Sequence, residues 1–164
     1  MGTNINLTLI PIVVGAITMG STTGAVLGFI SGALTFVFGG VLGGDLFTAT
    51  LFNYEPFFTA AVCIVKTTIA GFASGFVWSK LKKKNETLAV FTASALAPVV
   101  NTSIFIIGGL LFFGDALTKS GFLGTQSLVY FIVVVCALSN FLLEFATNVI
   151  LSPAIKRIIK AFRR

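Results

Sequence analysis

Residues 88–113 form one continuous apolar run without a single charged side chain. A helix needs about 20 mostly apolar residues to cross a hydrocarbon core of about 30 Å, so this run is long enough to span a bilayer. Charged residues make up only 10% of the chain, whereas soluble domains contain roughly 25%. A transmembrane barrel would instead alternate apolar and polar residues in segments of about ten. The sequence therefore predicts an all-α, polytopic membrane helix bundle.

The 164 residues leave room for five or six spans of about 20 residues, which indicates a single integral membrane domain, 1–164. Glycine pairs and polar residues mark two loops, at 39–55 and 114–126, and Gly20-Ser21 is expected to reverse the chain between two short spans. The five predicted spans are residues 5–19, 22–38, 56–78, 88–113 and 127–151.

The last span is expected to end at Ser152-Pro153. Beyond it, residues 154–164 place Ile155, Ile158, Ile159 and Phe162 on one helical face, with basic residues around them. This pattern is typical of an amphipathic helix that lies along the membrane surface.

Basic residues gather at 80–84 and in the 154–164 tail, and the positive-inside rule places both in the cytoplasm of a multi-pass cell-membrane protein. Counting back, the loops 39–55 and 114–126 face outside, and so does Met1. A short N-terminus on the outer side favours one more helix before Met1, which would give six spans.

The sequence lacks the residues that several classes of chemistry require. The chain has no histidine, no paired carboxylates and no nucleophile beside a base, and residues 39–44 lack the Gly-Lys-Ser/Thr ending of a phosphate loop. Cys63 and Cys136 lie in apolar runs and are interpreted as packing residues. The net charge of +6 comes from clusters at the ends of spans and does not indicate a nucleic-acid groove. We therefore expect no enzyme activity, metal, cofactor or nucleic-acid partner.

Gly24, Gly28 and Gly32 recur every four residues and so share one face of a helix. In a bilayer such a strip lets two helix backbones approach closely. The strip is interpreted as a docking surface for a partner helix, and packing against this chain's own helices is the alternative.

Polar side chains inside spans are costly and mark candidate functional sites. Lys66 lies ten residues after Pro56, about 15 Å along a helix. Asn101 and Asn140 fall at similar depths on two other spans, about 18 and 20 Å from the outer side. The three side chains are predicted to form the floor of a pocket open to the outside, where Lys66 meets a carboxylate or phosphate.

Glu144 offers a competing partner, because a Lys66–Glu144 ion pair would leave the asparagines as contacts between helices. Aromatic side chains near the outer loops are predicted to wall the pocket, although an interfacial aromatic belt explains them equally well. Those assigned to the site are Tyr54, Phe58 and Tyr130.

Three segments resemble the substrate-binding S components of energy-coupling factor (ECF) vitamin transporters. They are Leu9-Ile10-Pro11-Ile12-Val13-Val14-Gly15-Ala16 with the glycines that follow, Pro98-Val99-Val100-Asn101-Thr102, and Asn148-Val149-Ile150-Leu151-Ser152-Pro153. The resemblance implies a six-helix fold with an outward vitamin site, docked on a transmembrane T component and driven by two cytoplasmic ATPases. The family's first helix has no counterpart here, and the chain looks most like members thought to take pantothenate.

The favoured function is thus a vitamin-binding subunit of an ABC-type importer, for pantothenate or another carboxylated compound. A membrane scaffold without a ligand is the alternative from another class. An ion-coupled carrier is disfavoured, because no inverted repeat is recognisable.

Overall fold

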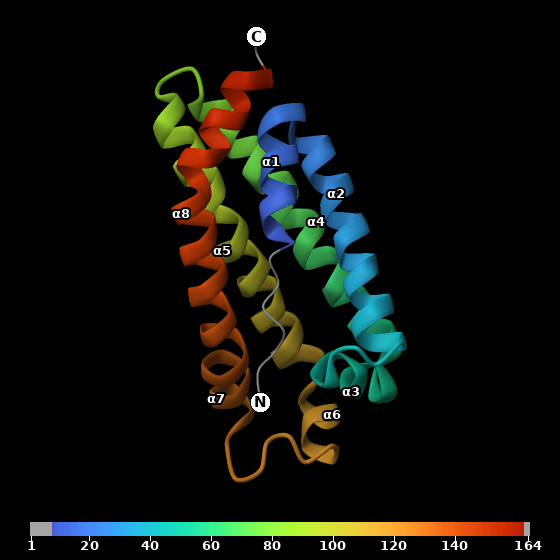
Figure 1. Ribbon diagram of the computed structural model, residues 1–164. Coiled ribbons are helices and arrows are strands. Elements are labelled where there is room, and N and C mark those ends of the chain that lie inside the picture. The colour runs from blue at the N-terminus through green and yellow to red at the C-terminus, as the bar shows by residue number, and fades with distance from the viewer. Residues whose placement is uncertain (1–7, 163–164) are drawn as a thin grey trace.

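A computed structural model describes residues 8–162 and shows a bundle of helices (Figure 1). Four helical stretches in this part of the chain are long and apolar enough to cross a membrane: Ser21–Val41, Pro56–Leu81, Glu86–Phe112 and Leu128–Ile159. No strand occurs between residues 8 and 162. The predicted polytopic membrane helix bundle is confirmed.

Helix α1 (Leu9–Met19) is shorter than the other apolar helices. Its 11 residues extend about 16 Å, roughly half of a hydrocarbon core. The expected first span began at Ile5, and residues 5–7, like Met1, lie outside the described residues. Gly20 ends α1 with φ 104°, a conformation that glycine adopts without strain. Helix α2 (Ser21–Leu34) starts directly after it, which confirms the predicted reversal.

The glycine strip of α2 packs against helix α4 (Pro56–Leu81) of the same chain. A Cβ atom on Gly28 would lie 2.2 Å from the carbonyl oxygen of Thr67, far inside van der Waals contact. Cβ atoms on Gly24 and Gly32 would each lie 2.5 Å from a backbone oxygen of α4, those of Gly71 and Cys63. The predicted close approach of backbones is present, but the chain itself fills this face. The assignment of Gly24, Gly28 and Gly32 to partner docking is corrected accordingly.

Both expected loops on one side of the bundle contain helices. The π-helical segment η1 (Thr35–Val41) extends α2, and α3 (Leu46–Tyr54) follows within the predicted loop 39–55. Asp45 begins α3 as its N-cap, because its Oδ2 accepts a hydrogen bond of 3.0 Å from the Thr48 amide. Helix α6 (Gly114–Lys119) lies in the second expected loop, and Figure 1 shows α3 and α6 at the same end of the bundle.

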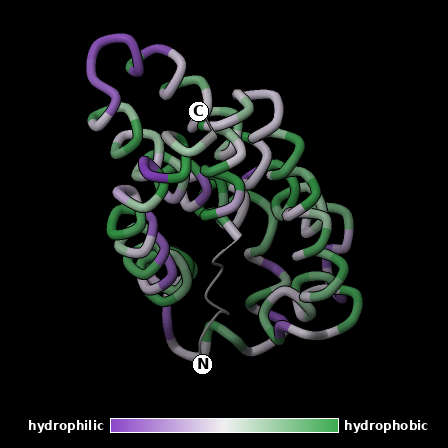
Figure 2. The backbone as a smooth tube through the Cα atoms, turned by 45° about the horizontal axis from the view of Figure 1, so that its top comes forward, coloured by the Kyte–Doolittle hydropathy of each residue, from purple (hydrophilic) through white to green (hydrophobic). Residues whose placement is uncertain are grey.

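Helix α5 (Glu86–Phe112) returns from the lysine-rich turn after α4. Figure 2 shows this hydrophilic turn projecting from one end of largely hydrophobic helices. The Lys156 ammonium donates a hydrogen bond to the Thr87 hydroxyl. The two basic clusters therefore lie at the same end of the protein, as the charge pattern predicts.

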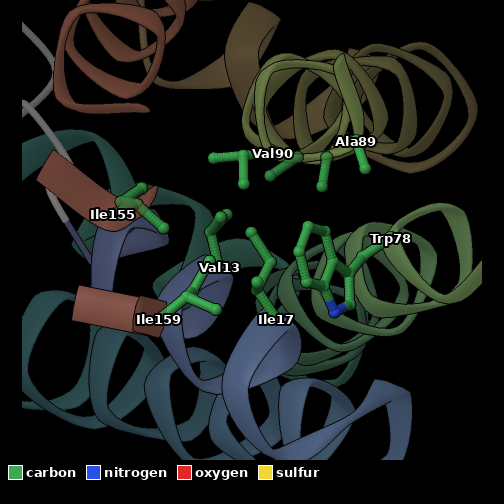
Figure 3. Packing of buried hydrophobic residues seen from close by; sticks show 9 residues of the cluster. Val13, Ile17, Trp78, Ala89, Val90, Ile155 and Ile159 are labelled. Carbon is green, nitrogen blue, oxygen red and sulfur yellow. The ribbon is translucent and has the colours of Figure 1, made fainter. Parts of the chain in front are cut away.

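The last span contains α7 (Leu128–Tyr130), the π-helical segment η2 (Phe131–Leu138) and α8 (Ser139–Phe162). Helix α8 passes through Pro153, so the expected end at Ser152-Pro153 is wrong. Ile155 and Ile159 are buried among Val13, Ile17 and Trp78 (Figure 3). Burying two isoleucines contributes about 3–6 kcal/mol, which offsets the roughly 3 kcal/mol that a proline costs inside a helix.

This packing also changes the interpretation of the tail. Ile155 and Ile159 are directed into the protein between α1, α4 and α5 and do not lie on its surface, whereas Ile158 is exposed. Phe162, Arg163 and Arg164 also belong to the predicted tail; the Phe162 side chain and residues 163–164 lie outside what the structure describes.

Candidate functional site

A cavity of about 280 Å³ lies between the long helices, toward the end where α3 and α6 are found. Lys66 of α4, Asn101 of α5 and Asn140 of α8 all line it. These three residues come from separate helices and were predicted to share one depth. The structure brings them together as that prediction requires.

The rest of the cavity wall is mainly apolar and aromatic, with one carboxylate. Asp45 contributes the carboxylate at the start of α3. The aromatic lining consists of Phe38, Phe47, Phe105 and Phe113. A concave apolar site with a few polar groups is the usual composition of a small-molecule site.

Glu144 holds the two asparagines in place from behind the wall. Its side chain is 1% exposed. Oε2 accepts a hydrogen bond from Asn101 Nδ2 at 3.2 Å, and Oε1 accepts one from Asn140 Nδ2 at 3.0 Å. The Oδ1 atoms of both asparagines, two residues that line the cavity, are buried without a hydrogen-bond partner.

Lys66 is half-buried, and its ammonium lies 5.4 Å from the centre of the Phe105 ring. Over residues 8–162 no ion pair within 4 Å joins it to Glu144, the competing partner that the sequence suggested. Its charge is therefore held by an aromatic face, which attracts cations, and its N–H donors are left for another group in the cavity.

The cavity adjoins a larger one of about 760 Å³. Gly44, Asp45, Phe47 and Cys136 line both. The larger cavity is otherwise bounded mainly by residues 120–126, the segment after α6. Asp45 and Phe47 therefore stand between the two spaces.

The model of the thiamine transporter protein family matches residues 1–160. The chain belongs to this family. Comparison with curated proteins and with solved structures gives no match. Membership makes the chain a substrate-binding subunit for vitamin transport, of the ECF S-component type. The family consists of transporter components, which are not enzymes in general.

The three aromatic residues that the sequence analysis assigned to the site do not line the cavity of this member of the thiamine transporter family. Tyr54 and Tyr130 are 45% and 50% exposed, and neither lines the cavity. Phe58 stacks on Phe112 with ring centres 4.3 Å apart, also outside the cavity lining. The structure does not bring these three to Lys66 and the asparagines.

Four residues that shape the site were missed as site residues. Asp45 was interpreted only as a loop marker, although aspartate is also one of the preferred residues at a helix N-cap, the position that it takes before α3. Glu144 was considered only as a partner for Lys66. Phe47 and Phe105 carried no signal of their own, since the sequence contains 18 phenylalanines and spacing does not distinguish those that face a cavity.

Between residues 8 and 162, no group of three or more histidine, cysteine, aspartate or glutamate side chains is arranged to hold a metal ion. The polar side chains that line the cavity are one ammonium, two amides, one carboxylate and four threonine hydroxyls, those of Thr35, Thr48, Thr59 and Thr102. This set can bind an organic molecule by hydrogen bonds and charge.

Proposed function

We propose that this chain is the thiamine-binding subunit of an ECF-type importer. It captures thiamine from outside in the cavity between α4, α5 and α8, and passes it on through a T component driven by two ATPases. The observation that carries the proposal is the meeting of Lys66, Asn101 and Asn140 in one cavity of a chain that the thiamine transporter model matches over residues 1–160.

The chemistry of the wall suits thiamine, which has a positively charged thiazolium ring and an amino-substituted pyrimidine. Phenylalanine faces attract a cationic ring, and the Asp45 carboxylate adds a negative charge on the same wall. The unpaired oxygens of Asn101 and Asn140 can accept hydrogen bonds from the pyrimidine amino group. Unpaired buried acceptors are costly, so a ligand that donates to them gains affinity.

Lys66 is the observation that favours a second candidate, pantothenate. Its ammonium lines the cavity and would pair with the pantothenate carboxylate. With thiamine, the same ammonium donates to the oxygen of the hydroxyethyl group instead. Thiamine is preferred because it also uses the acidic and aromatic lining.

The energy for transport would come from the other subunits. The chain has no phosphate-loop motif of its own. Since α4 covers the glycine strip, the T component would dock on a face other than Gly24, Gly28 and Gly32.

The test is to purify the protein in detergent and identify any retained small molecule by mass spectrometry. Titration calorimetry with thiamine and with pantothenate then compares the two ligands. Thiamine binding that is lost in a folded Asn101→Ala variant supports the proposal. Tight binding of pantothenate alone would select the second candidate, and a folded protein that binds neither would favour the scaffold alternative.

A further inference from the structure

Glu144 contributes to the site without lining the cavity. It is 1% exposed and lies on α8, one turn after Asn140. Both carboxylate oxygens are occupied by amide nitrogens of the cavity wall, Asn101 Nδ2 and Asn140 Nδ2. Asn148, one turn further along α8, donates to the Glu144 backbone oxygen at 2.8 Å and so does not compete for the carboxylate.

Each oxygen of the Glu144 side chain accepts a hydrogen bond from one amide nitrogen, so both asparagines turn their nitrogens toward it. Their oxygens are then the atoms left without a partner, as is observed for Asn101 Oδ1 and Asn140 Oδ1. If glutamine stood at this position, its own NH₂ would need an acceptor, and one asparagine would have to present its oxygen inward.

We propose that Glu144 is a positioning residue that sets ligand specificity. By fixing the orientation of Asn101 and Asn140, it makes the cavity wall an acceptor of hydrogen bonds, selective for ligands that carry an amino group on a heteroaromatic ring. The inference rests on the proposed function and deepens it. It assigns the discrimination between amino and carbonyl ligands to a side chain that touches neither.

The experiment compares thiamine with oxythiamine, the analogue in which an oxo group replaces the pyrimidine amino group. Binding of both is measured for the wild type and for Glu144→Gln. The wild type is expected to prefer thiamine by roughly tenfold or more, since a mispaired buried polar group costs about 1–3 kcal/mol. In Glu144→Gln one amide turns over, and the preference is expected to fall by at least about tenfold.

The ratio of the two affinities separates positioning from stability. If Glu144 had a purely structural role, Glu144→Gln would lower the affinities for thiamine and oxythiamine by the same factor. An unchanged ratio of the two affinities in folded Glu144→Gln therefore overturns the inference. Glu86→Gln is the matched control, because Glu86 starts α5 at the opposite end of the bundle; its ratio should equal that of the wild type.

Should Glu144→Gln fail to fold, Asn140→Ala decides the question. It removes one of the two acceptors and should lower the thiamine preference in the same direction. An unchanged preference in that variant overturns the inference. A wild type that binds thiamine and oxythiamine equally also overturns it while leaving vitamin binding intact, whereas a wild type that binds neither overturns the proposed function itself.

Discussion

The Thr67 hydroxyl donates a hydrogen bond to the backbone carbonyl oxygen of Gly28 at 2.7 Å. This contact joins α4 to α2 at one of the points where their backbones approach closely. Thr67 is fully buried, and a side chain larger than hydrogen on Gly28 would meet its carbonyl oxygen. The packing of the glycine strip thus fixes the position of α4, which forms one wall of the cavity.

Gly28→Ala is expected to destabilise the protein. The new methyl group would lie 2.2 Å from a backbone oxygen. Because that oxygen belongs to the backbone, the clash can be relieved only by moving the two helices apart. Overpacking of this kind costs roughly 1–3 kcal/mol. The measurement is thermal unfolding in detergent.

Gly39→Ala is the control for this substitution, because its Cβ would find its nearest neighbour at 3.5 Å, an ordinary contact. If Gly28→Ala unfolds at the wild-type temperature, the tight α2–α4 packing is not present in the protein.

This strip shows what sequence can and cannot predict in a membrane protein. Spacing of four residues identifies the face on which backbones approach, because it reflects helix geometry. It does not identify which helix packs against that face. In the folded protein α4 does so, through its own small residues Gly71 and Gly75. Partner choice is a property of the folded bundle.

The polar part of the site was more predictable than its aromatic part. Lys66, Asn101 and Asn140 were found because a polar group in a bilayer is rare and depth can be counted along a helix. Tyr54, Phe58 and Tyr130 were assigned from their place near the loops, which does not determine where a ring points. The π-helical segments η1 and η2 further shift side chains around the helix axis relative to α-helical counting.

Ile155→Ala is expected to destabilise the protein by about 2–4 kcal/mol, because it leaves a cavity among buried apolar side chains. Ile155 is 2% exposed, whereas Ile158, on the same helix, is 40% exposed. Ile158→Ala should therefore cost little, and thermal unfolding of both variants gives the comparison. Equal effects would mean that the end of α8 does not pack against Trp78 and Val13, as a surface-lying tail would require.

Asp45→Ala and Asp45→Asn should have different effects on stability and similar effects on binding. The alanine variant loses the hydrogen bond to the Thr48 amide and with it about 1 kcal/mol of helix capping, whereas asparagine caps a helix as well as aspartate does. Both remove the negative charge from the cavity wall.

Thiamine affinity is therefore expected to fall in both Asp45 variants, by about fivefold for an interaction of ~1 kcal/mol. Only Asp45→Ala should also unfold at a lower temperature. Calorimetry and thermal unfolding measure the two effects separately. Wild-type affinity in Asp45→Asn would show that the carboxylate charge takes no part in binding.

Lys66→Met keeps much of the length of the side chain and removes the ammonium. The half-buried ammonium lines the cavity without an ion pair to Glu144, so it is free to meet the hydroxyethyl end of thiamine. A phosphate at that end would form a charge-assisted hydrogen bond, roughly twice as strong as a neutral one. Lys66→Met should therefore lower the affinity for thiamine monophosphate by about tenfold more than the affinity for thiamine, a difference of ~1.4 kcal/mol in binding free energy. Titration calorimetry with both ligands measures this difference; equal losses would place the hydroxyethyl end away from Lys66 and reverse the orientation assigned to the ligand.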